Sequence, residues 1–200
     1  MLKTYVEKMC AGRDASHGAE HMHRVARTAK KIGQELNLGT EILDACEWVA
    51  ELHDVADHKY DKDGSLSEAV ADFVQENRPT DYVMILKTIE YISFSKEKKK
   101  GKRYFEQILG PEWTLVRDIV SDADKLEALG TIGIERCHKY TSETHPGASE
   151  EEIIRIMHEH AEDKLYKLAT EYIMTAPGRE MALPLHDEMK AWFIAHGHTG

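Results

Sequence analysis

The sequence has few cysteines, no long apolar run and no excess of basic residues. Its three cysteines, Cys10, Cys46 and Cys137, stand far apart and form no CxxC pair, which favours free thiols in a reducing cytosol. No apolar stretch approaches the roughly 20 residues that cross a bilayer, and the first ten residues lack the apolar core of a signal peptide. We therefore expect a cytoplasmic protein with no membrane partner.

The charge balance argues against one class of partner. The chain has 26 Lys and Arg against 36 Asp and Glu, a formal net charge of −10. Proteins that bind nucleic acid by neutralising phosphates need an excess of positive charge, so we expect no nucleic-acid partner. A small phosphorylated ligand stays compatible with this charge, because a metal ion and a few nearby cations can reverse the field within one pocket.

The apolar residues recur with a period of 3.6, which predicts an all-α fold. No strand, internal repeat or linker is evident, so we expect one compact domain over residues 1–200. The charged segment 96–103 and the segment 141–148 are expected to be loops. The Lys-rich segment is typical of a solvated loop, although it could also close over a triphosphate. The stripes predict helices over 2–9, 22–36, 40–53, 66–76, 82–93, 111–126, 149–172 and 185–193, with 134–140 as helix or turn. Thr40 is expected to cap the third of these helices, Pro111 to open the sixth, and Ser149 with Glu152 to form a capping box.

Four residues of metal-ligand type interrupt these apolar stripes. His21 lies at the start of the second predicted helix, His53 and Asp54 end the third, and Asp124 follows a core-forming stretch. Ionisable groups are costly to bury unless they are paired or bind a metal. Two imidazoles and two carboxylates form a mixed N/O set, which suits Mn, Fe, Co, Ni or Zn, with Mg also possible.

The order and spacing of these residues resemble a known family. Residues 21–25 (HMHRV), 52–54 (LHD) and 122–126 (DADKL) match the H…HD…D signature of the HD superfamily of metal-dependent phosphohydrolases. The resemblance covers nearly the whole chain and is similar to the stand-alone branch that includes nucleotide pyrophosphohydrolases. It implies a single HD-type helical bundle that hydrolyses a small phosphorylated metabolite, with a nucleotide expected, releasing phosphate or pyrophosphate.

The resemblance also implies roles for individual residues. His21, His53, Asp54 and Asp124 would bind the metal, and Asp54 and Asp57 would serve catalysis. Asp57 lies three residues after Asp54, so on a continuing helix it shares a face with Asp54, and it would orient or deprotonate the attacking water. The branch with two metals needs two further histidines between Asp54 and Asp124. Only His58 lies there, so we expect one divalent ion. The candidate phosphate-binding groups are Lys59, Lys125, His17, Arg24, Lys164 and Arg179.

Two other functions stay open at this point. A non-catalytic HD module that binds a metal or ligand within a regulatory complex would carry the same metal ligands. Oxidative chemistry at a diiron site is disfavoured by the missing histidines. The oligomeric state is also open, with a homodimer as one option. Metal-supported turnover over a panel of nucleotides separates the enzyme from the binding module.

Overall fold

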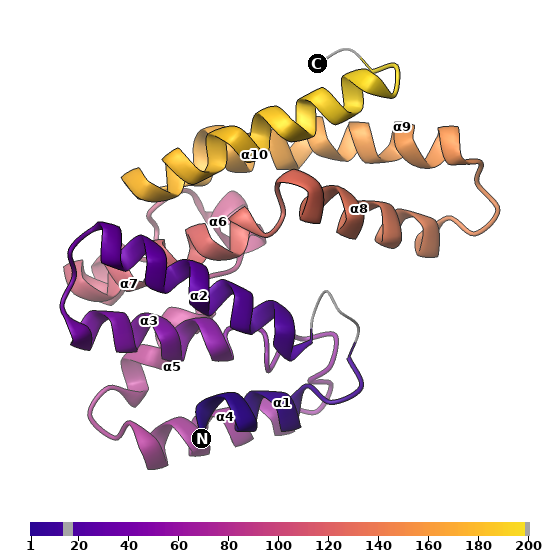
Figure 1. Cartoon of the computed structure of the whole chain (residues 1–200). Coiled ribbons are helices and arrows are strands. Elements are labelled where there is room, and N and C mark those ends of the chain that lie inside the picture. Colours follow the sequence, from indigo (N-terminus) through magenta and orange to yellow (C-terminus); the bar gives the residue numbers. More distant parts are fainter. Residues whose placement is uncertain (14–17, 199–200) are drawn as a thin grey trace. The chain divides into compact units, whose positions relative to one another are not determined.

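The structure, a computed structural model, describes residues 1–13 and 18–198, and all regular secondary structure in them is helical (Figure 1). This confirms the all-α prediction. The helices gather into two compact units, residues 1–123 and residues 124–200, which we describe separately. The single-domain prediction stays a prediction. No helix of the described residues combines the length and apolar character needed to cross a membrane.

The first unit is built around the packed pair of helices α2 and α3. The buried residues Met22, Val25, Ala29 and Ile32 line one side of α2, as the period of 3.6 predicts. Thr40, expected to cap α3, is its first helical residue, and Gly39 is the cap. The helices of this unit are α1 (Leu2–Met9), α2 (Ala19–Glu35), α3 (Thr40–Leu52), α4 (Ser65–Asn77), α5 (Tyr82–Glu90), α6 (Phe94–Lys100) and all but the last three residues of α7 (Glu106–Leu126).

Helix α7 bends where the sequence places Gly110 before Pro111. Gly110 has φ 72° and ψ 173°, a conformation that breaks the helix and that glycine adopts without a side-chain clash. Pro111 then begins the second part of α7, where its fixed φ and missing N–H cost nothing. This bend therefore confirms the sequence prediction that Pro111 opens a helix. The second part of α7 carries Asp124.

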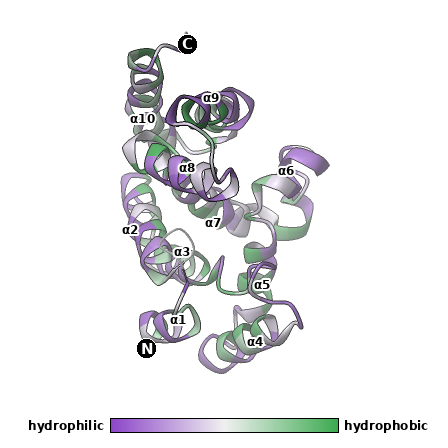
Figure 2. Cartoon of the chain, turned by 90° about the vertical axis from the view of Figure 1, so that its right-hand side faces the viewer, coloured by the Kyte–Doolittle hydropathy of each residue, from purple (hydrophilic) through white to green (hydrophobic). Residues whose placement is uncertain are grey.

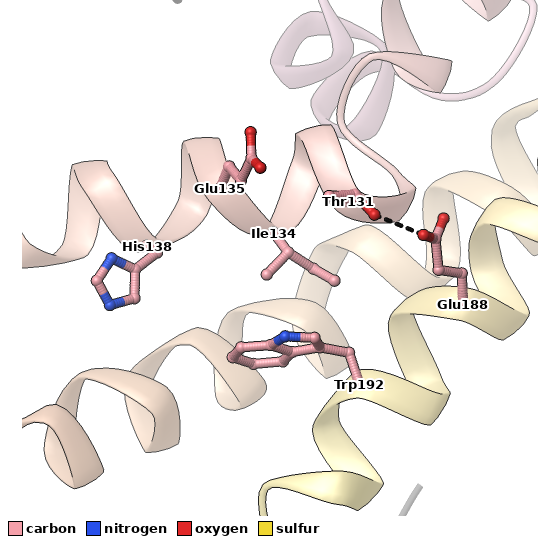
Figure 3. Close-up of a pocket in the computed structure, with 6 residues that line it drawn as sticks. All are labelled: Thr131, Ile134, Glu135, His138, Glu188 and Trp192. Atoms are coloured by element: carbon pink, nitrogen blue, oxygen red, sulfur yellow. Dashed lines mark hydrogen bonds between the residues drawn. The ribbon is translucent and has the colours of Figure 1, made fainter.

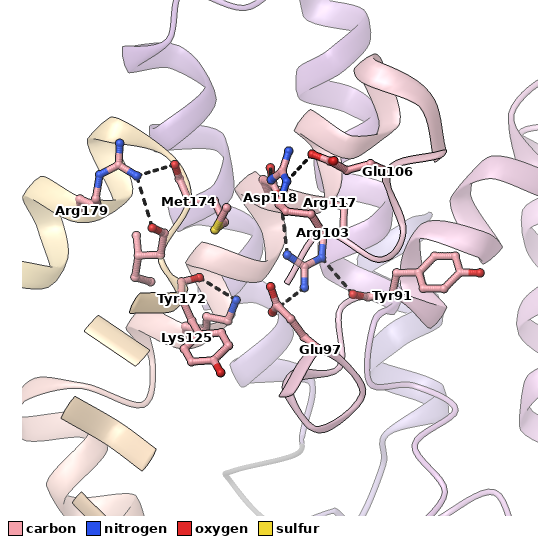
Figure 4. Close-up of polar contacts among 11 residues, drawn as sticks. Tyr91, Glu97, Arg103, Glu106, Arg117, Asp118, Lys125, Tyr172, Met174 and Arg179 are labelled. Carbon is pink, nitrogen blue, oxygen red and sulfur yellow. Dashed lines mark hydrogen bonds and ion pairs between the residues drawn. The ribbon is translucent and has the colours of Figure 1, made fainter. Parts of the chain in front are cut away.

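The prediction of a loop over 96–103 is wrong, because α6 runs through its first half. Ser93 caps the helix by accepting a hydrogen bond from the Lys96 backbone N–H at 3.4 Å. Glu97 is fully buried and its Oε2 lies 2.8 Å from Arg117 Nη2 on α7, while Arg117 Nε donates to the Tyr91 carbonyl (Figure 4). The buried ion pair therefore fixes α6 to α7 and leaves the neighbouring lysines exposed.

The second unit contains α8 (Gly130–Thr144), α9 (Glu150–His160), the π-helical turns η1 (Ala161–Leu165) and η2 (Leu168–Tyr172), and α10 (Ala176–Ala195). Ser149 and Glu152 form the predicted capping box before α9. Helix α8 continues to Thr144, into the segment expected to be a loop. Figure 2 shows hydrophobic and hydrophilic residues alternating around α8, α9 and α10, as expected for helices with one buried face.

Candidate metal centre

Three predicted ligands converge in the structure. His21 lies in the first turn of α2, His53 directly follows α3, and Asp124 lies near the end of α7. Each offers one ligand atom, and these atoms all lie within 4.8 Å of one another. Both histidines are buried and Asp124 is half-buried. Segments separated by up to about a hundred residues of sequence therefore supply one cluster.

Asp54 is not a member of that three-residue set but lies against both histidines. Its Oδ2 is 3.9 Å from His21 Nε2 and 3.6 Å from His53 Nε2. Metal–nitrogen and metal–oxygen bonds of about 2.0–2.2 Å place two ligands of one ion no more than roughly 4.3 Å apart. The distances from Asp54 Oδ2 to the two histidines fall within that limit. The ligand atoms of His21, His53 and Asp124, which lie up to 4.8 Å apart, would have to approach one another only slightly to meet it. The donor set and its spacing therefore fit a divalent ion.

The orientation of His53 favours ligation through Nε2. Its Nδ1 lies 2.7 Å from the Ala50 carbonyl oxygen, which can only accept a hydrogen bond. Nδ1 must therefore carry the proton, and neutral His53 presents the lone pair of Nε2 towards Asp54. A backbone carbonyl that fixes the ring and tautomer in this way is the usual support of a metal-binding histidine.

Arg13 holds the segment that contains Asp54, a role that the sequence analysis missed. Its guanidinium donates to the Asp54 carbonyl at 3.0 Å and to the Val55 carbonyl at 2.6 Å. The same group lies 4.2 Å from the centre of the Tyr60 ring. These contacts hold Arg13 against the turn that follows the end of α3 at Leu52. No local pattern marks Arg13, because its partners lie more than forty residues away in sequence.

His23 and Glu51 form a second buried polar pair beside the cluster. His23 Nδ1 lies 2.6 Å from Glu51 Oε2, and Glu51 is fully buried. Burial raises the pKa of Glu51, and the hydrogen bond from His23 opposes that shift. His23 Nε2 also lies 3.8 Å from Glu7 Oε1 on α1. His23 belongs to the HMHRV motif, but no local pattern in the sequence assigns a role to either residue.

Asp57 follows the cluster in a turn rather than in a continued helix. The expectation that it shares a helical face with Asp54 is corrected, since α3 ends at Leu52. A turn instead joins the two residues, with the Asp57 N–H donating to the Asp54 carbonyl at 3.2 Å. The Asp57 carboxylate accepts from the Lys59 N–H at 2.8 Å and lies 3.5 Å from His58 Nδ1. Its catalytic role stays a prediction.

The candidate phosphate-binding groups occupy different environments. Arg24 is half-buried on α2, one turn after His21, and Lys59 is exposed after the turn. In the second unit Lys125 is buried and its Nζ donates to the Tyr172 carbonyl at 2.9 Å, so it ends η2 (Figure 4). Arg179 donates to the Met174 carbonyl, Lys164 is half-buried in η1, and His17 lies outside the described residues. Their roles stay predictions.

A separate pocket of about 550 Å³ lies between α8 and α10 in the second unit (Figure 3). Ile134 and Trp192 form its apolar part, and Thr131 Oγ1 donates to Glu188 across one end. Glu135 and His138 complete the lining, and His138 lies 2.9 Å from Glu150. None of the predicted site residues that the structure describes lines this pocket.

The helices and the converging imidazoles and carboxylates define a helical protein with a candidate divalent-cation site. The sequence model of the HD domain family matches residues 18–129. This range includes the three clustered residues and Asp54. The chain therefore belongs to the HD-domain family. A comparison with curated proteins finds no match.

Several solved structures share the fold over nearly the whole chain. Bacillus subtilis YpgQ in complex with ADP is 23% identical, with 97% of this chain and 90% of that chain covered and a TM-score of 0.69. A Lactobacillus plantarum protein is 24% identical, with coverage of 98% and 93% and a TM-score of 0.73. A Bacillus thuringiensis HD-superfamily hydrolase is 22% identical, with coverage of 98% and 92% and a TM-score of 0.63. At these identities the likeness establishes the fold.

Proposed function

We propose that this protein is a metal-dependent phosphohydrolase of small phosphorylated metabolites, with nucleotides as the first substrates to test. The convergence of His21, His53 and Asp124, with Asp54 beside both histidines, is the observation that carries the proposal. Membership of the HD-domain family supports it. The structure of YpgQ with ADP supports a nucleotide ligand, since that protein shares the fold.

In this proposal His21, His53, Asp54 and Asp124 hold one divalent ion, chosen from Mn, Fe, Co, Ni, Zn and Mg. A divalent ion supplies Lewis-acid stabilisation of a phosphoryl oxygen and acidifies bound water. In the neutral ring, the hydrogen bond to the Ala50 carbonyl leaves the lone pair of His53 on Nε2, and Arg13 holds the backbone at Asp54.

The remaining polar groups of the first unit would act on the substrate. Asp57 would orient or deprotonate the attacking water from the turn that follows Asp54. Arg24, one turn along α2 from His21, and the exposed Lys59 would bind phosphate oxygens. These assignments rest on the positions of the residues in the sequence, close to His21 and Asp54.

The test is a screen of nucleotides and sugar phosphates with Mn²⁺, Co²⁺, Ni²⁺ and Mg²⁺, with products identified by mass. We expect metal-dependent release of phosphate or pyrophosphate, abolished by His53→Ala. His138→Ala is the matched control, because it removes a histidine that pairs with Glu150 outside the cluster, and it should keep full turnover. Metal binding without turnover on any substrate would instead identify a non-catalytic binding module.

A further inference from the structure

We propose that His23 and Glu51 form a positioning pair that sets the rotation of α2 against α3 and so sets the spacing of His21 and His53. This inference rests on the proposed metal centre. Neither residue belongs to the ligand set. The pair is defined by the 2.6 Å contact between His23 Nδ1 and Glu51 Oε2.

The pair of metal ligands, His21 and His53, and the His23–Glu51 pair lie at the same level of α2 and α3. His23 follows His21 by two residues on α2, and Glu51 precedes His53 by two residues on α3. The rings of His21 and His53 are 5.4 Å apart between their centres, so the clustered histidines and the His23–Glu51 pair join the same two helical ends. Helices α2 and α3 also pack along their lengths (Figure 1).

Helix geometry places the two pairs on opposite flanks of that contact. Residues two apart on an α-helix are rotated by about 200° around the axis. His53 keeps α-helical dihedral angles (φ −57°, ψ −32°), so the rule holds for Glu51 and His53 as well as for His21 and His23. The metal cluster therefore lies on one flank and the buried pair on the other, where Glu7 of α1 approaches His23.

Two contacts on opposite flanks prevent one helix from rolling against the other. Side-chain ends lie roughly 5–6 Å from a helix axis, so a roll of about 10° moves them by about 1 Å. A displacement of that size is large compared with the tolerance of metal–ligand bonds, which is about 0.2 Å. The short, directional hydrogen bond between two buried side chains resists such a roll more strongly than apolar packing, which tolerates sliding.

The alternative is that the pair only stabilises the fold. Breaking a buried pair by removing one partner is destabilising, so Glu51→Ala alone would mix the two effects. Replacing both residues with leucine removes the hydrogen bond and keeps an apolar volume, a change that is often neutral or stabilising. Val49→Ala on the same helix is the converse control, because it removes fully buried methyl groups without touching a polar contact.

The experiment measures Mn²⁺ and Co²⁺ affinity of the full chain by calorimetry, together with the visible absorption spectrum of the Co²⁺ form. We expect the His23→Leu, Glu51→Leu double variant to stay folded, to bind metal at least about tenfold more weakly and to show an altered Co²⁺ spectrum. Glu51→Gln, which keeps an oxygen able to bond His23, should retain most of the affinity. Val49→Ala should lose stability and keep the wild-type affinity and spectrum.

Wild-type affinity and spectrum in the folded double variant would overturn the positioning role. If the double variant does not fold, Glu51→Gln against Glu51→Asp decides: the shorter Asp side chain withdraws the carboxylate from His23, so equal metal affinity of these two variants would also overturn it. A wild-type chain that binds neither ion would contradict the metal centre itself, which separates that failure from failure of the positioning pair.

Discussion

Replacing Arg117 with methionine should destabilise the protein strongly, although Arg117 lies outside the candidate metal centre. Its guanidinium is fully buried, lies 2.8 Å from Glu97 and 2.9 Å from the Tyr91 carbonyl, and stacks 4.1 Å from the centre of the Phe105 ring. Arg117→Met leaves the buried Glu97 carboxylate without this counter-charge. Removing one partner of a buried ion pair costs about 3–5 kcal/mol, a large share of the roughly 5–15 kcal/mol by which domains are stable.

Urea denaturation followed by far-ultraviolet circular dichroism measures this loss. A loss of about 3 kcal/mol lowers the midpoint by about 1 M or more at typical urea sensitivities of about 1–3 kcal/mol per M. The variant that combines Glu97→Leu with Arg117→Met removes both charges and should recover most of the stability. Arg155→Met, which breaks the exposed pair with Glu159, should cost less than about 1 kcal/mol. A loss of under 1 kcal/mol for Arg117→Met, or a double variant as unstable as the sum of both single variants, would refute this reasoning.

Three further predictions follow from single residues. Asp57→Asn should keep the metal and lower turnover by about 10²–10⁴-fold, and full turnover with an unchanged pH profile would exclude its role as a base. Burial raises the pKa of Cys46 to about 12. Its thiol should therefore resist a disulfide reagent at pH 8 until urea unfolds the chain. Prompt labelling of Cys46 in the native protein would contradict this. Gly130→Ala should lower the melting temperature, because φ is +62° there and a Cβ would lie 2.8 Å from Glu188; an unchanged melting temperature would argue otherwise.

Local patterns were sufficient to predict most of the helices. The apolar stripe of α2, the Ser149–Glu152 capping box and the proline that begins the second part of α7 each depend on residues close together in sequence. The cluster of His21, His53 and Asp124 was predicted because the order of these residues along the chain resembles the signature of the HD superfamily. The helix features need no knowledge of distant contacts, whereas the cluster joins segments far apart in sequence and was predicted only through the resemblance to a family.

The failures share a physical cause, which is dependence on distant partners. Helix α6 looked like a solvated lysine run, because the burial of Glu97 depends on Arg117, twenty residues later. The role of Lys125 in phosphate binding stays a prediction, but no local pattern indicated that its ammonium group donates to a carbonyl 47 residues away. Arg13 went unnoticed for the same reason. Sequence patterns report which residues can be buried, whereas the choice of polar partner is made by the fold.

The most direct test of the central claim is the metal content of the purified chain after equilibration with excess Mn²⁺ or Co²⁺ and removal of unbound ions. The site formed by His21, His53, Asp54 and Asp124 predicts one ion per chain. His53→Ala and Asp54→Ala should each lose that ion, because each removes a ligand and Asp54 also removes neutralising charge. One ion per chain that disappears in both variants is the predicted result. No bound ion, two ions held by protein side chains, or one ion that survives both substitutions would contradict the claim.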